Sequence, residues 1–150
     1  MGIKVIANNK KSRFDFELLD RFEAGLVLRG SEVKSLRNGQ CNLKDSYISF
    51  VGGEAFLQNA HISEYKASSY NNHEPERLRK LLLHKREVDK IHGSLKEKGL
   101  SCVPTKIYFK NGKVKLEIAL AKGKKKADKR EAIKKRDANR ELQRVLKHSK

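Results

Sequence analysis

The 150-residue sequence predicts a mainly β fold of the α+β class: an antiparallel β-barrel with a few short helices and a basic C-terminal tail. Apolar and polar residues alternate as in strands, and two tight-turn signals join such strands, which predicts the barrel. Residues 122–150 carry 13 Lys and Arg against 4 Asp and Glu, a net charge of +9, which predicts the tail. We therefore expect a body over residues 1–121 and a tail over residues 122–150.

The first strand signals lie near the N-terminus. Phe14, Phe16 and Leu18 alternate with acidic residues, which is the period-two pattern of a half-buried strand. The apolar run at 24–28 predicts a second strand. The basic segment 8–13 precedes them, and it either lies on a phosphate backbone or is a frayed, solvated terminus.

Two hairpins are predicted from their turn residues. One turns at Gly52-Gly53 and the other at Asn111-Gly112, a pair that tolerates the positive φ angles of a type I′ turn. The four strands are expected at 47–51, 54–57, 106–110 and 113–120. In the last strand Val114, Leu116, Ile118 and Leu120 share the inward face, and Lys113, Lys115 and Glu117 share the other. With Lys106 and Tyr108, that second face is either an RNA-binding surface or an ordinary solvated one.

Three short helices are expected between the strands. Ser31 caps the first, over residues 32–37, and Asn38-Gly39 ends it. Pro75 suits the first turn of a second helix that contains Leu78, Leu81 and Leu82. The third runs from Lys85 to Lys98, buries Val88, Ile91 and Leu95, and ends at Gly99. Five to seven strands with these helices favour an oligonucleotide-binding (OB) type barrel, with a β-sandwich as the alternative.

Charge and composition narrow the range of partners. The chain has 35 Lys and Arg against 18 Asp and Glu, and its net charge of +17 predicts a polyanionic partner, either nucleic acid or an anionic membrane. No apolar run is long enough to span a bilayer, and the N-terminus has no signal-peptide pattern. Cys41 and Cys102 lack metal-site spacing, so we expect free thiols in a reducing compartment, the cytoplasm.

The sequence lacks the motifs of the common catalytic classes. It contains no HExxH, GxGxxG or GxSxG string, and its five histidines and two cysteines do not have zinc-ligand spacing. Asp45, Glu87 and Asp89 keep a metal-dependent nuclease open as an alternative, although carboxylates on a basic protein are usually ion-pair partners. We expect a protein that is not an enzyme and uses no metal or cofactor.

The tail is rich in helix-forming residues. From Ala127 to Lys147 almost every residue favours helix, but its narrow apolar line is too small to offset the entropy of ordering. We expect a segment that is disordered when free and helical on RNA. The alternative is a tail that stays solvated.

Six short sequence strings, taken together in their order and spacing, resemble a known protein family. They are FEAG at 22–25, GSEVKSLR at 30–37, NLKDSY at 42–47, RKLLLH at 79–84, LAKGKK at 120–125 and DKR at 128–130. Together they resemble the SsrA-binding (tmRNA-binding) protein family of bacterial trans-translation, also termed small protein B. The resemblance implies an OB-type barrel that binds the tRNA-like domain of tmRNA, as a monomer without membrane contact. It also implies delivery of tmRNA, alanylated and carried by elongation factor Tu, to the A site of a stalled 70S ribosome.

The resemblance also implies which residues bind RNA. On the body these are Glu23, as an acceptor for base or sugar groups, Lys115, on phosphate, and Leu82, in apolar contact or merely in packing. Lys122, Lys124 and Lys125 continue the RNA-binding set, and Asp128, Lys129 and Arg130 are implied to act in the decoding centre and mRNA channel. Ala127 stands where members of the family often have a ring, so Lys129 and Arg130 would act through phosphate contacts. A ribosomal or general translation protein with the same barrel remains the alternative.

Overall fold

The computed structural model describes residues 2–66 and 72–123. Within that part of the chain, twelve elements follow one another: β1 (Ile3–Asn8), α1 (Lys10–Asp15), β2 (Phe16–Leu26), α2 (Gly30–Arg37), β3 (Cys41–Asn42), β4 (Tyr47–Val51), β5 (Glu54–Gln58), β6 (His61–Ile62), β7 (Arg79–Leu82), α3 (Lys85–Lys98), β8 (Ser101–Lys110) and β9 (Lys113–Gly123). Seven strands pair in the order β1-β8-β9-β2-β7-β5-β4, and β3 pairs with β6. Every ladder is antiparallel.

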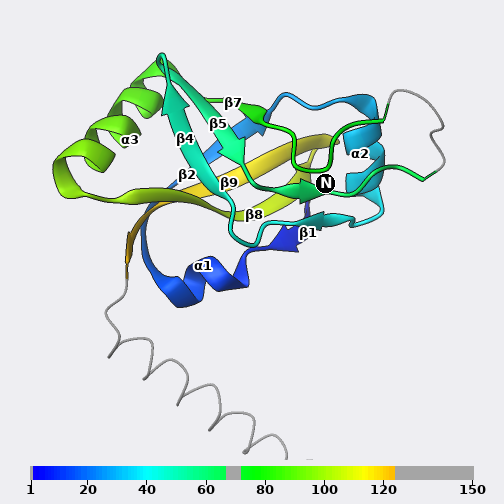
Figure 1. Ribbon diagram of the computed structural model, residues 1–150, viewed down its shortest axis with the longest axis horizontal. Coiled ribbons are helices and arrows are strands. Elements are labelled where there is room, and N and C mark those ends of the chain that lie inside the picture. The colour runs from blue at the N-terminus through cyan, green and yellow to red at the C-terminus, as the bar shows by residue number, and fades with distance from the viewer. Residues whose placement is uncertain (1, 67–71, 124–150) are drawn as a thin grey trace, which may run out of the picture.

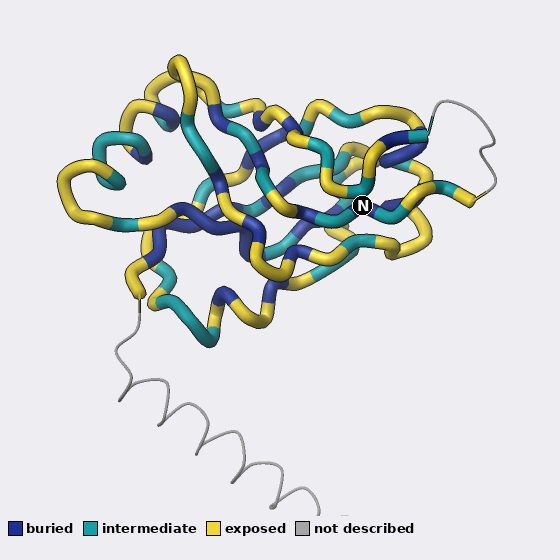
Figure 2. The backbone as a smooth tube through the Cα atoms, in the orientation of Figure 1, coloured by how far each residue is buried: buried dark blue, intermediate teal, exposed yellow. Residues whose placement is uncertain are grey.

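The seven-stranded sheet curls into the predicted OB-type barrel. Although β4 lies at one end of the strand order, it packs across β8 near the other end, as Figure 1 shows. The interior is apolar, and the buried positions concentrate along the central strands (Figure 2). Fully enclosed aliphatic side chains include Leu36, Leu43, Leu57, Ile62, Ile91, Ile107, Leu116 and Ile118. Their removal from water is the main force that stabilises the barrel.

Both predicted hairpins are confirmed. β4 and β5 turn at Gly52-Gly53, and β8 and β9 turn at Asn111-Gly112. Asn111 has φ 50° and Gly112 has φ 78°, the two positive angles that a type I′ turn requires. Leu116, Ile118 and Leu120 are buried as expected, and Val114 is half-buried. The last strand extends past the expected end, because Lys122 and Gly123 still pair with the start of β2.

Two of the three expected helices are present. α3 has the expected bounds and ends at Gly99, whose φ of 60° is the left-handed conformation of a helix C-cap. α2 begins earlier than expected, since Arg29 and not Ser31 is its N-cap. The Glu32 carboxylate accepts a hydrogen bond from the Arg29 backbone N–H at 2.8 Å. The Ser31 hydroxyl instead lies 2.8 Å from Nδ1 of the buried His73.

The expectation of a second helix, after Pro75, is wrong. Residues 79–82 form β7, in which Arg79 and Leu81 are buried and Lys80 and Leu82 are exposed. The leucine spacing suggested a helix because Leu78, Leu81 and Leu82 fit a 3.6-residue repeat as well as a short strand. Pairing with β2 and β5 decides the outcome, a tertiary effect that local spacing does not contain.

The N-terminal region also differs from expectation. Phe14 lies in α1 and not in a strand, and β2 runs without a break where two strands were expected. The N-cap of α1 is Asn9, whose side chain accepts from the Ser12 N–H at 3.2 Å and donates to the Pro104 carbonyl at 2.9 Å. The alternative of a frayed terminus at 8–13 is therefore wrong. No helix of the described part has the length and apolar character that a membrane crossing needs.

Candidate nucleic-acid interface

The centre of the candidate interface is a row of residues across four strands. Gly25 of β2 pairs with Lys115 of β9 on one side and with Leu82 of β7 on the other. Lys115 in turn pairs with Tyr108 of β8. Paired residues on neighbouring strands project from the same face of a sheet. Lys115 and Leu82 therefore stand on either side of a residue that has no side chain, and this leaves a hollow between them.

Glu23 adds a carboxylate to this hollow. It lies two residues before Gly25 on β2 and therefore faces the same side of the sheet. Glu23, Gly25, Leu82 and Lys115 line one open cavity of about 640 Å³, and residues of β5, β7 and the start of α3 line its other side. The structure thus brings together the three body residues that the resemblance implied, although they are far apart in the sequence.

The Glu23 carboxylate is held in place by two donors from β8. The Tyr108 hydroxyl donates to Glu23 Oε2 at 2.5 Å, and the Lys110 Nζ lies 3.3 Å and 3.4 Å from the two carboxylate oxygens. The Tyr108 hydrogen bond, together with Lys110 and Lys115, lowers the pKa of Glu23 below its usual value. The cavity therefore presents an ionised carboxylate that accepts hydrogen bonds.

The cavity also presents a cation and an apolar surface. No ion pair among the described residues engages the half-buried Lys115 ammonium group, whereas Lys80 at the cavity wall pairs with Glu54 at 3.0 Å. Leu82 is 55% exposed and so does not serve mainly to fill the core. An ammonium group suits a phosphate, and an exposed leucine suits the face of a base or sugar.

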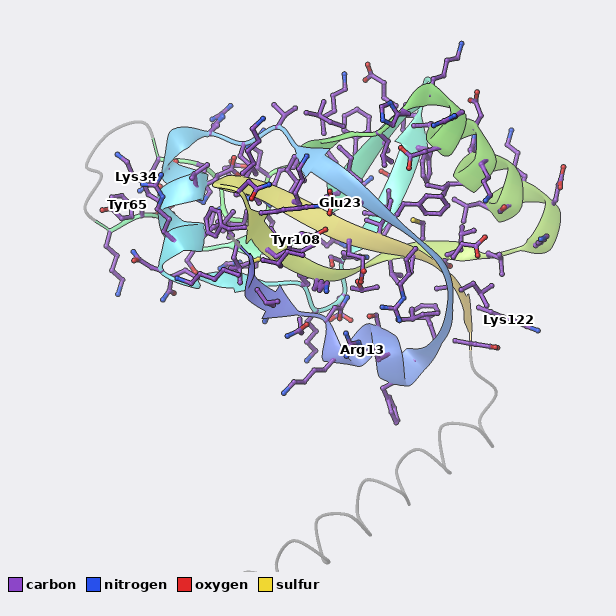
Figure 3. The ribbon with its side chains drawn as sticks, turned by 180° about the vertical axis from the view of Figure 1, so that it is seen from behind. Arg13, Glu23, Lys34, Tyr65, Tyr108 and Lys122 are labelled. Carbon is purple, nitrogen blue, oxygen red and sulfur yellow. The ribbon has the colours of Figure 1, made fainter. Side chains whose placement is uncertain are left out.

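Tyr108 does not offer its ring to a ligand, contrary to its expected place on an RNA-facing surface. Only 3% of the residue is exposed, and the Lys106 ammonium lies over its ring, 5.5 Å from the centroid. Burial and the hydrogen bond to Glu23 raise the pKa of the Tyr108 hydroxyl, so it remains a donor. Figure 3 shows Glu23 on β2 and Tyr108 on β8, on the same face of the sheet.

Gly25 is a site residue that sequence reasoning missed. It lies within a regular strand, and glycine makes a strand less stable than other residues do. A close approach of another group is a physical reason for its presence. A Cβ atom at this position would lie 3.3 Å from the Leu82 Cβ and would intrude on the hollow. The available signal was a glycine within a strand pattern, two residues after Glu23.

The remaining implied residues lie toward the C-terminal end. Lys122 is exposed near the end of β9, opposite Glu17, and lies at the same end of the molecule as Arg13 of α1 (Figure 3). Lys124, Lys125, Asp128, Lys129 and Arg130 lie outside the described residues, as does the expected helical tail. Among residues 2–66 and 72–123, no three His, Cys, Asp or Glu side chains are grouped to hold a metal ion.

The chain is similar to known proteins over most of its length. The family model described as SmpB protein matches residues 6–148. An SsrA-binding protein of Bdellovibrio bacteriovorus is 64% identical, over 99% of this chain and 98% of that protein. One of Persephonella marina is 56% identical, over 98% of this chain and 97% of that protein. A chain from the solved structure described as "tmRNA-SmpB: a journey to the center of the bacterial ribosome" is 44% identical with a TM-score of 0.68, over 85% of this chain and 93% of that chain. The chain therefore belongs to the SmpB family of SsrA-binding proteins.

Proposed function

We propose that this chain is a tmRNA-binding adaptor of trans-translation. It binds the tRNA-like domain of tmRNA and delivers it, with elongation factor Tu and the attached alanine, to the A site of a stalled 70S ribosome. The nascent chain is then tagged for degradation and the ribosome is released. The single observation that supports this role most strongly is the cavity in which Glu23, Leu82 and Lys115 surround Gly25.

Each residue of the cavity has a distinct part in this proposal. Lys115 contacts a backbone phosphate, which contributes affinity without sequence preference. Glu23 accepts a hydrogen bond from an N–H or O–H group of a base or sugar, which contributes selectivity, because an RNA with no donor at this point meets only negative charge. Leu82 packs against the apolar face of the bound nucleotide. Recognition through a structured RNA fold suits a chain whose 10 aromatic residues are too few for extensive base stacking.

The role that we propose is binding and not catalysis. An adaptor needs groups that hold RNA in place, whereas a nuclease needs groups that activate water or a metal. The cavity carboxylates are engaged: Glu54 pairs with Lys80, Glu87 accepts from the His84 backbone N–H at 3.1 Å, and Glu23 accepts from Tyr108. We propose that the adaptor acts in the cytoplasm, without metal or cofactor.

We further propose that body and tail have separate tasks. The body, residues 1–121, holds tmRNA, and the tail, residues 122–150, enters the vacant decoding centre and mRNA channel. Lys122, Lys124 and Lys125 continue the contact with RNA, and Asp128, Lys129 and Arg130 act on the ribosome, the cations through phosphates. The net charge of +9 in the tail supports contact with a polyanion.

Replacing Lys115 tests the proposed cavity. Lys115→Ala should weaken tmRNA binding and reduce the slope of log affinity against log salt by about one unit or somewhat less, the scale of one lost phosphate contact. Filter binding at several salt concentrations measures both effects. The melting temperature should stay unchanged, because the ammonium group forms no ion pair within the described fold.

The matched control is Lys96→Ala, an exposed lysine of α3 that does not line the cavity. It should lower affinity and salt slope less than Lys115→Ala does. Equal effects of the two substitutions would mean that Lys115 adds only to the general positive charge, and the proposed cavity would then not be the binding site.

A further inference from the structure

The hydroxyl of Tyr108 has a single described hydrogen-bond partner, the carboxylate of Glu23. The two residues are 85 positions apart in the sequence, and the tyrosine on β8 reaches across β9 to the glutamate on β2. A tyrosine needs no such contact to fill a core, since phenylalanine has the same ring. The role of the hydroxyl is therefore its hydrogen bond to Glu23.

The tyrosine is itself closely packed. Its ring is buried in the sheet and the Lys106 ammonium covers one face of it. A buried aromatic side chain has only two torsion angles, and packing fixes both. The fold therefore sets the position of the hydroxyl. Through the hydrogen bond, the hydroxyl sets the position of the Glu23 carboxylate.

A glutamate without such a partner would not remain oriented. An exposed glutamate samples several rotamers. Here two cations are near enough to attract the carboxylate, because Lys110 lies 3.3 Å from Oε2 and Lys115 lines the same cavity. The Tyr108 hydroxyl fixes Oε2, so the remaining lone pairs of the carboxylate point in a defined direction.

We propose that Tyr108 is a positioning residue that fixes Glu23 as an oriented acceptor for the hydrogen-bond donor edge of an unstacked RNA base. This inference rests on the proposed function and adds the group that orients its selective contact. The paired N–H donors of a guanine edge fit a fixed carboxylate best, because both oxygens can then accept in one plane. The cavity beside Gly25 gives such a base room to enter.

Tyr108→Phe tests the role with little change to the fold. The ring and its packing remain, and only the donor to Glu23 is lost. The affinity for tmRNA should fall roughly tenfold, the scale of one hydrogen bond to a charged group. The control is Tyr47→Phe, which removes a hydroxyl that donates to Gln58 at 3.3 Å on the surface and should leave binding unchanged.

A double-mutant cycle separates positioning from a structural effect. In a Glu23→Gln background Tyr108→Phe should cause little further loss, because the charged acceptor that it orients is already absent. If Tyr108→Phe binds as the parent does while Glu23→Gln is impaired, Tyr108 has no positioning role and the proposed cavity stands. If Glu23→Gln is itself without effect, the proposed role of the cavity fails. If the two losses simply add, Tyr108 acts independently of Glu23 and the inference is overturned.

A carbon-13 NMR titration of the Glu23 carboxyl gives a readout that a general loss of structure would not mimic. Lys110, Lys115 and Glu117 neighbour this carboxyl on the sheet. Across the cavity are the Lys80–Glu54 pair, Glu87 at the start of α3, and His84 and Lys85. Tyr108→Phe leaves all of them in place, so the pKa of Glu23 should rise by loss of its Tyr108 hydrogen bond alone. An unchanged pKa in the folded variant would contradict the inference.

Discussion

At the scale of single residues, Gly25 lines the cavity between Lys115 and Leu82. Any side chain at this position would stand between Lys115 and Leu82 and occupy the hollow. The strand itself does not require glycine, because an interior strand position is usually more stable with a larger residue. We therefore attribute the glycine to the close approach of the Leu82 side chain, and we propose that it also keeps room for a ligand beside Lys115.

Gly25→Ala should separate binding from stability. The added methyl group meets the Leu82 Cβ at 3.3 Å, and the exposed leucine can shift, so the free energy of unfolding should change by no more than about 1 kcal/mol. The affinity for tmRNA should fall roughly tenfold, about 1.4 kcal/mol. Filter binding and urea unfolding of the same preparation measure the two quantities.

Gly93→Ala is the matched control. This glycine lies within α3, a methyl group added to it would meet no atom within contact distance, and it does not line the cavity. Its substitution should leave tmRNA binding unchanged and raise stability by up to about 1 kcal/mol. If Gly25→Ala binds as tightly as Gly93→Ala, no ligand approaches the floor of the cavity.

Residue chemistry alone predicted only part of this site. The outward face of Lys115 followed from strand alternation, but Glu23 and Leu82 came from the resemblance, since a lone carboxylate on a basic protein has many possible uses. The burial of Tyr108 was not predictable. Alternation shows which side chains face outward, but it does not show which of these are covered by their neighbours. The register that places Gly25 between Lys115 and Leu82 is a long-range property of the fold.

At the scale of elements, a buried ion pair joins α2 to β7. The carboxylate of Glu32 accepts from Arg79 Nε and, at 2.5 Å, from Arg77 Nη2. The side chains of Glu32 and Arg79 are both 0% exposed. Arg79 also donates to the carbonyls of Ala60 at 2.7 Å and Pro75 at 2.9 Å. This cluster fixes the segment that leads into the cavity wall.

Glu32→Gln should destabilise the fold strongly. It leaves the buried Arg79 guanidinium without a counter-charge, and breaking a buried pair in this way costs about 3–5 kcal/mol. Asp45→Asn is the control: Asp45 pairs with Lys11 at the surface, and Asn tolerates the φ of 62° at that position. The control should cost less than about 1 kcal/mol. Equal losses of stability in urea unfolding would show that the Glu32–Arg79 pair has no special structural role.

The same pair predicts an acid dependence. Burial alone would raise the pKa of Glu32, but hydrogen bonds from Arg77, the Arg29 N–H and Arg79 outweigh it and lower that pKa. A carboxyl with a lowered pKa in the folded state contributes stability above its unfolded pKa of about 4.3, and this contribution is lost as the pH falls through the folded value. Glu32→Gln should therefore flatten the loss of stability in acid, which urea unfolding at a series of pH values measures.

Elements with strong local signals were predicted well. The Asn111-Gly112 hairpin and helix α3 formed as expected, because turn chemistry and apolar spacing agree with the final packing there. The strand expected at 14–18 was wrong only at its start, because Phe14 and Asp15 end helix α1, which begins at the Asn9 cap, while residues 16–18 lie in β2. Strand β7 was predicted as helix, since its leucines fit both repeats and pairing with β2 decides between them.

At the scale of the whole molecule, we assign tmRNA binding to the body and the action on the ribosome to the tail. Deleting residues 127–150 should leave the described barrel complete, because its last strand ends at Gly123. The shortened chain should keep most of its tmRNA affinity and should fail to support tagging of stalled nascent chains in a reconstituted translation system. Tagging that survives the deletion would show that the tail has no necessary part on the ribosome.

The most direct test of the central claim is competitive filter binding at moderate salt. Labelled tmRNA is bound to the full chain, and to the chain that ends at residue 126, in the presence of unlabelled tmRNA, bulk tRNA or ribosomal RNA. We predict that only unlabelled tmRNA competes efficiently, and that it does so for both chains, because the selective contacts lie around Gly25 in the body. Equal competition by bulk tRNA or ribosomal RNA, or loss of tmRNA binding on truncation, would contradict the claim.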